Sequence, residues 1–209
     1  MTNKRPLAGL LSKIVLGTAL AASLSGCVAL AVGGAAATAL ASNDRRTIGM
    51  QTEDKSINVK AEIKMQQLTG ENGHVNVTSY NRKVLLTGEV RDEAMKQAAE
   101  REVRAIDNVV SVINELEIAG PSSYTSRSND ALITTKVKAS LVDAKDISAN
   151  SFKVVTEHGA VYLMGRVTQR EATQAAEIAR GVNGVNKVVK VFEYISEDEW
   201  KQYQPKPAQ

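Results

Sequence analysis

The chain contains one stretch of sequence twice, and this repeat limits the possible fold more than any other feature. Asp54–Ile118 aligns with Asp130–Ile195 at an offset of 76 or 77 positions. Val84–Val90 reads VLLTGEV where Val161–Val167 reads VYLMGRV, and the tetrapeptide QAAE occurs unchanged in both copies. Internal repeats mark supersecondary units of one kind that stand side by side in the chain. We therefore expect two small modules with the same fold.

The hydrophobic spacing predicts the same order of elements in each copy: helix, strand, strand, helix, strand. In the first helix of the first copy, Ile57, Ala61 and Met65 follow the spacing i, i+4, i+8, which places them on one face. The corresponding residues of the second copy repeat this spacing: Ile133, Val137 and Leu141. Val75 and Val77 alternate with polar residues, as in a half-buried strand.

Short polar segments predict where each copy turns. Asn81–Arg82 and Glu157–Gly159 separate the first two strands of each copy, which favours hairpins. Gly88 and Gly165 occupy the same late position in the second strand, which suggests a bulge or a close approach of another backbone. Thr168 with Glu171 three residues later predicts a capping box at the second helix of the second copy.

The N-terminus has the features of a bacterial lipoprotein signal peptide. Basic residues precede Ile14–Leu24, an apolar run of eleven residues that is too short to span a bilayer. Small residues then lead to Cys27, the position that a lipoprotein acylates on sulfur and exposes as its new N-terminus. Stable anchoring needs two or more acyl chains. Val28 follows in place of Asp, and this favours sorting to the outer membrane, facing the periplasm.

Charge and composition exclude several function classes. The whole chain has 26 basic and 23 acidic residues, but three of the basic ones lie in residues 1–26, which leaves 23 of each and a net charge of zero. A protein without basic excess is a poor candidate for nucleic-acid binding. A single cysteine excludes a disulfide framework. Because this cysteine is the expected site of acylation, we expect no free thiol. We expect no cofactor.

The residue types needed for catalysis or metal binding do not form a recognisable pattern. His74 and His158 stand at non-equivalent positions of the repeat, so we interpret each as a solvated polar residue and expect no metal site. The glutamates of residues 93–102 alternate with basic residues, as on a salt-bridged helix surface. We therefore expect no enzymatic activity.

The duplicated module resembles the BON domain family. The resemblance rests on the Leu-x-Gly-x-Val strand, the Ala-Ala-Glu helix, the Val-x-x-Val ending and the segment 129–137 (NDALITTKV). It implies an α+β fold in which each module combines a three-stranded sheet with two helices. Two such modules behind a lipidated cysteine are similar to outer-membrane lipoproteins. The implied function is phospholipid binding and support of envelope integrity, with enrichment at the division site, and not catalysis.

We accordingly divide the chain into six parts: a lipoprotein signal peptide (1–26), the lipidated cysteine with a flexible tether (27–51), module 1 (52–118), a Gly/Pro/Ser-rich linker (119–128), module 2 (129–195) and a C-terminal tail (196–209). A module of about 65 residues buries only about 60% of its unfolded surface and is marginally stable alone. The two modules should therefore pack together.

The expected phospholipid surface lies on the first helix of module 2. Residues 129–195 carry 9 basic and 7 acidic side chains, net +2, whereas residues 52–118 carry 9 and 12, net −3. The expected lipid-binding residues are an apolar stripe with its neighbours: Leu132, Thr135, Lys136, Val137, Ala139 and Val142. In the similar lipoproteins a tryptophan stands where this chain has Leu132. An apolar stripe beside lysines suits shallow insertion under anionic headgroups.

Two other functions remain open at this point. A protein-interaction or chaperone-like module would use its helix faces to bind polypeptide and would ignore lipid vesicles. A hydrolase of envelope polymers would need paired carboxylates or a nucleophile beside a base, and the sequence predicts neither.

Overall fold

The computed structural model describes residues 44–203, which contain both modules. The elements of the first half, in chain order, are α4 (Ile48–Thr69), η1 (Gly70–Asn72), β1 (Gly73–Tyr80), β2 (Lys83–Val90), α5 (Glu93–Arg104), β3 (Ser111–Asn114) and β4 (Glu117–Ile118). Those of the second half are α6 (Tyr124–Asp143), η2 (Ala149–Ser151), β5 (Lys153–Glu157), β6 (Ala160–Val167), α7 (Gln169–Arg180), β7 (Lys187–Tyr194) and α8 (Glu197–Lys201). The expected α+β fold with the order helix, strand, strand, helix, strand is confirmed twice.

Both sheets have the same topology, with the second strand in the middle. β1 pairs antiparallel with β2, and β3 and β4 pair one after the other in parallel with β2. In module 2, β5 pairs antiparallel with β6, and β7 runs parallel to β6 over its whole length. β3 and β4 together take the place that β7 has in module 2, so each module has three strand positions.

Each module has its own hydrophobic core between its helices and one face of its sheet. The predicted helix residues are buried there: Ile57, Ala61, Met65, Ile133, Val137 and Leu141. The predicted capping box of Thr168 and Glu171 is also present. Corresponding helix positions therefore face the core in both modules.

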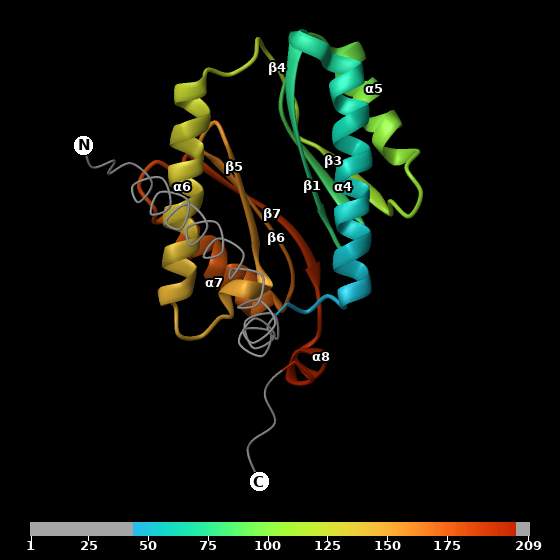
Figure 1. Cartoon of the computed structure of the whole chain (residues 1–209). Helices are drawn as coiled ribbons and strands as arrows, with labels where there is room; N and C mark the ends of the chain where they lie inside the picture. The colour runs from blue at the N-terminus through green and yellow to red at the C-terminus, as the bar shows by residue number, and fades with distance from the viewer. Residues whose placement is uncertain (1–43, 204–209) are drawn as a thin grey trace, which may run out of the picture. The chain divides into compact units, whose positions relative to one another are not determined.

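The other faces of the two sheets meet in a third buried cluster. Tyr80 and Leu85 of module 1 lie against Tyr162, Met164 and Val191 of module 2. The helices lie outside and the sheets lie between them (Figure 1). The modules therefore pack together, as expected for units that are only marginally stable alone.

Gly88 and Gly165 are required where another backbone approaches. A Cβ on Gly88 would lie 2.0 Å from the carbonyl oxygen of His74, and its φ of +105° favours glycine. A Cβ on Gly165 would lie 2.4 Å from the carbonyl oxygen of Ser151. The expectation of a close backbone approach is confirmed at both positions.

The segment expected to be a linker is only partly one. α6 begins at Tyr124, because Ser123 caps it: its hydroxyl accepts a hydrogen bond from the backbone N–H of Ser126 at 3.2 Å. The chain between the modules is therefore shorter than residues 119–128. α8 likewise lies within the part expected to be a tail, where Ser196 caps it.

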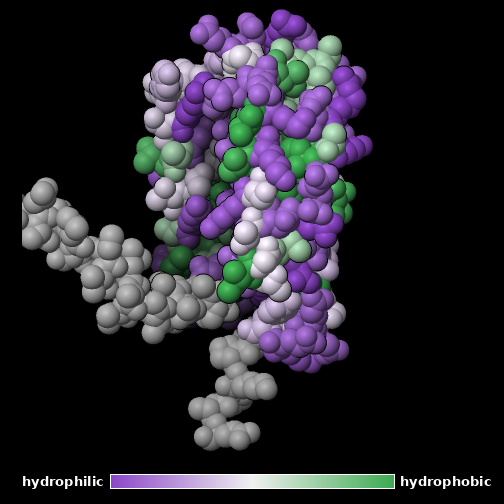
Figure 2. All heavy atoms as spheres, turned by 45° about the vertical axis from the view of Figure 1, so that its right-hand side comes forward, coloured by the Kyte–Doolittle hydropathy of each residue, from purple (hydrophilic) through white to green (hydrophobic). Residues whose placement is uncertain are grey.

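The outer surface on the side of α4 is largely hydrophilic. Apolar residues appear there as separate spots between charged and polar side chains (Figure 2). The exposed apolar side chains of α4 include Ile48, Val59 and Ile63.

Candidate functional site

The apolar stripe expected on module 2 is exposed on α6. Leu132 is 60% exposed and Val142 69%, and Thr135 and Ala139 between them are exposed as well. Lys136 and Lys138 flank the stripe, and neither forms an ion pair with another residue of the part of the chain that the structure describes. The helix therefore presents apolar groups and unpaired ammonium groups together.

Val137 was expected to be part of the lipid surface, and this expectation is wrong. Its side chain is completely buried in the core of module 2, between Ile133 and Leu141. The reason is the helical period: residues 133, 137 and 141 share the core face, whereas 132, 135, 139 and 142 lie beside it. Val137 therefore packs α6 against the core of module 2 and is not accessible to a lipid surface.

Tyr124 extends the stripe and was missed from the sequence. It opens α6, is 86% exposed, and lies two turns before Leu132 on the same side of the helix. The Arg127 guanidinium lies over its ring, 5.5 Å from the centroid. Tyrosine is favoured at membrane–water interfaces, so the helix has an interfacial ring although Leu132 is aliphatic. The start of α6 was not predicted because the surrounding serines and proline are typical of a linker.

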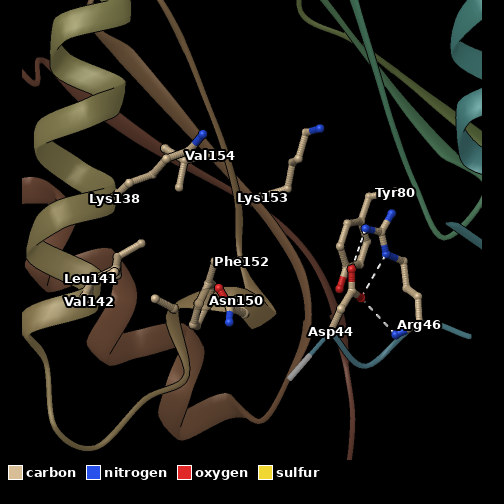
Figure 3. Close-up of a pocket in the computed structure, with 11 residues that line it drawn as sticks. Asp44, Arg46, Tyr80, Lys138, Leu141, Val142, Asn150, Phe152, Lys153 and Val154 are labelled. Atoms are coloured by element: carbon tan, nitrogen blue, oxygen red, sulfur yellow. Dashed lines mark hydrogen bonds and ion pairs between the residues drawn. The ribbon is translucent and has the colours of Figure 1, made fainter. Parts of the chain in front are cut away.

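A cavity opens beside the C-terminal end of the stripe. It has a volume of about 350 Å³ and is lined by Lys138 and Val142 of α6, by Lys153 of β5 and by Asp44, among others (Figure 3). Burial lowers the pKa of Lys153, and the positive charges of Arg46 and Lys138 lower it further. The cavity thus holds excess positive charge that an anion would neutralise.

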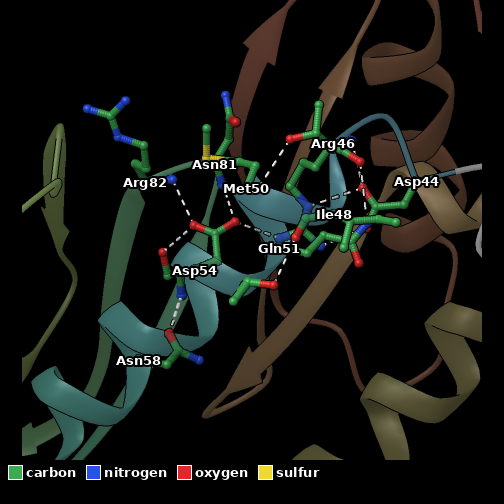
Figure 4. A network of polar contacts seen from close by, with 12 residues as sticks. Asp44, Arg46, Ile48, Met50, Gln51, Asp54, Asn58, Asn81 and Arg82 are labelled. Carbon is green, nitrogen blue, oxygen red and sulfur yellow. Dashed lines mark hydrogen bonds and ion pairs between the residues drawn. The ribbon is translucent and has the colours of Figure 1, made fainter.

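The entry segment, residues 44–46, fixes the start of the described chain to this cavity. Arg46 donates to Asp44 at 2.7 Å and to Asp54 at 2.8 Å, and its guanidinium lies over the Tyr80 ring. Asp54 also accepts hydrogen bonds from the backbone N–H groups of Asn81 and Arg82 in the β1–β2 turn (Figure 4). Burial raises the pKa of Tyr80 to about 12, so the phenol stays neutral.

Arg45 ties the entry segment to module 2 by a buried ion pair. Its guanidinium donates two hydrogen bonds to the Glu171 carboxylate, at 2.6 and 2.8 Å, and both side chains are almost completely buried. Trp200 Nε1 donates to the same carboxylate at 2.9 Å. Burial acts to raise the pKa of Glu171, but the hydrogen bonds from Arg45 and the Thr168 backbone outweigh it and hold that pKa below its ordinary value.

The two histidines do not behave as isolated solvated residues, which corrects the sequence-based expectation. His74 Nδ1 lies 3.5 Å from one oxygen of Glu89, and His158 Nε2 lies 2.7 Å from the other. Glu89 is completely buried. The start of β1 and the end of β2 in module 1 lie beside the β5–β6 turn of module 2, so non-equivalent positions of the repeat come together. Symmetry of the repeat was the wrong criterion.

His158 has a second carboxylate partner. Its Nδ1 lies 3.1 Å from Glu117 Oε2, and its backbone N–H donates to Asp130 at 3.0 Å. Burial lowers the pKa of the imidazole, but the hydrogen bond with Glu117 and the charge of Glu89 outweigh this and raise it.

The expected signal peptide, lipidated Cys27 and most of the tether lie outside the described residues. Within residues 44–203, no helix combines the length and the hydropathy needed to cross a bilayer.

Comparison with known proteins agrees with the repeat. The family model described as BON domain matches residues 56–120 and 129–196. The chain is 39% identical over 175 residues to the outer membrane lipoprotein DolP of Haemophilus influenzae, which covers 82% of this chain and 90% of that protein. It is 32% identical over 154 residues to the 21 kDa hemolysin of Actinobacillus pleuropneumoniae, covering 73% of this chain and 79% of the relative. Osmotically-inducible protein Y of Escherichia coli matches over 61 residues at 43% identity, 29% of this chain and 30% of that one.

Proposed function

The chain is a member of the BON domain family with two such modules, and on this premise we propose that it is a non-enzymatic outer-membrane lipoprotein that binds anionic phospholipid through module 2. The observation that carries the proposal is the exposed stripe of α6 beside unpaired lysines. A helix with apolar groups and basic flanks lies in the plane of the interface and inserts only its apolar side. The relative named an outer membrane lipoprotein supports the location.

The entry segment supports a common orientation for anchor and stripe. Asp44 lines the same cavity as Lys138 and Val142, so the described chain begins beside the C-terminal end of the stripe. Cys27 precedes Asp44 by 17 residues, a span of at most about 60 Å. Acyl chains on Cys27 and the stripe of α6 can therefore reach the same leaflet, the inner one for a protein that faces the periplasm. Mass spectrometry of the mature N-terminus tests the anchor.

The cavity beside the stripe supports a preference for anionic headgroups. Lys138 and Lys153 face it without an ion-pair partner among residues 44–203. Each basic residue near an anionic leaflet contributes about 1 kcal/mol. A phosphate at the cavity mouth would offset the mutual repulsion of these ammonium groups while the apolar stripe contacts the acyl region.

Vesicle flotation with the acyl-free chain, residues 28–209, tests the proposal. The described part has two complete cores and a third cluster that joins them, all within residues 44–203. Leu132→Glu places a charge in the middle of the stripe and should abolish binding to phosphatidylglycerol vesicles. Leu132 is 60% exposed, so the melting temperature should change little.

Ile63→Glu is the matched control, because Ile63 is 51% exposed on the corresponding helix of module 1. It should leave vesicle binding unchanged. If Leu132→Glu binds as well as the unchanged chain, the stripe is not the lipid surface. If neither anionic nor zwitterionic vesicles bind the unchanged chain, the protein-interaction function becomes the better assignment.

We extend the proposal to support of envelope integrity, with enrichment at the division site, as the family resemblance implies. Support of envelope integrity is tested by measuring the detergent sensitivity of a deletion strain that carries either the unchanged chain or the Leu132→Glu variant. Fluorescence microscopy of a tagged chain in dividing cells tests the second. A complementing Leu132→Glu variant would separate envelope support from lipid binding.

A further inference from the structure

We propose that the two modules share a binding site for a divalent transition-metal ion of the zinc type, formed by His74, Glu89 and Glu157 with His158 as the fourth ligand. His74 and Glu89 come from β1 and β2 of module 1, and Glu157 and His158 from the end of β5 and the following turn of module 2. Nitrogen or oxygen atoms of the first three residues lie within 4.8 Å of one another.

The burial of the two carboxylates requires a positive partner. Glu89 is completely buried and Glu157 is 6% exposed. No lysine or arginine among the described residues lies within ion-pair distance of either carboxylate. Within residues 44–203, the Glu157 side chain accepts one hydrogen bond, from the Asn76 amide at 2.8 Å, and Glu89 Oε2 accepts the Ser122 backbone N–H at 3.0 Å. Apart from the two histidines near Glu89, these partners are neutral donors, which do not compensate two buried negative charges.

Two buried ligand atoms in the cluster have no hydrogen-bond partner in the structure. They are His74 Nδ1 and Glu89 Oε1. His158 Nε2 approaches Glu89 Oε1 to 2.7 Å as an ion-pair contact. His74 Nδ1 and Glu89 Oε1 thus have only ion-pair neighbours within the cluster, and an imidazole nitrogen with a carboxylate oxygen is a donor set that zinc binds.

The mixed ligand set selects the class of ion. Imidazole with carboxylate suits zinc and its neighbours in the transition series, whereas magnesium and calcium prefer oxygen alone. In a tetrahedral zinc site, nitrogen and oxygen ligands lie about 2.0–2.2 Å from the ion.

Glu117 gives His158 the orientation of a metal ligand. Its Oε2 lies 3.1 Å from His158 Nδ1, so a proton on Nδ1 leaves the Nε2 lone pair directed at the cluster. A carboxylate on the distal nitrogen is the usual partner of a metal-bound histidine. This contact comes from β4, a fourth strand that contributes to the same cluster after β1, β2 and β5.

The site has an opening for the ion. A cavity of about 440 Å³ between β1 and α6 is lined by both His74 and Glu157. An ion bound there would connect module 1 to module 2 at one end of the sheet interface. Metal binding would therefore stabilise the packing of the modules as well as fill the site.

Equilibrium dialysis of the untagged full chain in detergent micelles against Zn²⁺ at pH 7.5 tests the proposal. We expect one zinc per chain, with an affinity at least tenfold lower for His74→Ala and Glu89→Gln. Glu62→Gln, which removes an exposed carboxylate of α4, is the control and should bind as the unchanged chain does. Zinc should also raise the melting temperature of the unchanged chain and of the control, but not of His74→Ala.

Co²⁺ provides a second measurement at the same site. We expect the visible absorption bands of a four-coordinate ion, lost in His74→Ala. If Glu89→Gln fails to fold, His74→Ala decides, because His74 is partly exposed at the start of β1. The proposal is overturned if the chain binds no zinc, or if His74→Ala binds it with unchanged affinity. In either case the histidines themselves supply the positive charge.

Discussion

At the residue scale, Glu171 shows how one carboxylate can join three parts of the chain. It caps the start of α7, receives two hydrogen bonds from Arg45 of the entry segment, and accepts one from Trp200 of α8. These contacts satisfy a charge that is almost completely buried. The capping role of Glu171 could be predicted from its distance to Thr168. The partnership with Arg45 could not, because 126 residues separate the two.

Arg45→Ala leaves this buried carboxylate without its cation and should lower the free energy of unfolding by about 3–5 kcal/mol. Chemical denaturation at pH 7 measures it. Arg91→Ala is the control: Arg91 pairs with Asp92 on the surface, and such pairs contribute at most about 1 kcal/mol. Equal effects of the two substitutions would contradict the role given to Arg45.

The lowered pKa of Glu171 makes this stabilisation dependent on pH. The folded-state pKa lies below the unfolded value of about 4.3, so the full stabilisation is present above pH 4.3. It is lost as the pH falls through the folded-state pKa. The stability difference between the unchanged chain and Glu171→Gln should therefore be largest near pH 7 and shrink towards pH 3. A difference that grows on acidification would be inconsistent with a depressed pKa.

At the element scale, α6 explains which predictions from sequence succeed. The spacing of Ile133, Val137 and Leu141 predicts its core face correctly, because the period of a helix is local information. Its beginning at Tyr124 was missed, since serines and a proline make the preceding segment resemble a linker. The cavity beside it could not be foreseen, because Lys153 and Asp44 reach it from other elements.

The lysines at this cavity should account for the electrostatic part of vesicle binding. Lys138→Gln combined with Lys153→Gln removes about 2 kcal/mol of attraction to an anionic leaflet, which is roughly a 30-fold loss of affinity at low salt. High salt should reduce the difference. Lys55→Gln with Lys60→Gln on α4 is the matched control and should have little effect. A double variant of α6 that binds as well as this control would remove the cavity from the proposed surface.

At the scale of the whole molecule, the sheet interface decides how the modules act. The central strand β2 carries an unbroken apolar run in which Val84, Leu85 and Leu86 are all buried. A strand with only one covered face would alternate, so the run itself indicates that both faces are buried. The local sequence does not show which part of the chain covers the second face of the sheet. The contacts of His74 and His158 with Glu89 therefore could not be predicted from the sequence.

Leu85→Asp places a charge in the cluster between the sheets and should separate the modules while their own cores remain. Leu85 lies in the shared cluster, whereas Val84 and Leu86 point into the core of module 1. Small-angle scattering of residues 28–209 should give a radius of gyration near the 15 Å or so of a compact unit of 160 residues, enlarged by the terminal segments. The variant should give a larger value with unchanged helix content by circular dichroism.

Val59→Asp, on the exposed face of α4, should scatter as the unchanged chain does. If the unchanged chain already scatters as two independent particles, the modules do not hold together through their sheets, and the stripe of α6 must orient itself at the membrane without help from module 1.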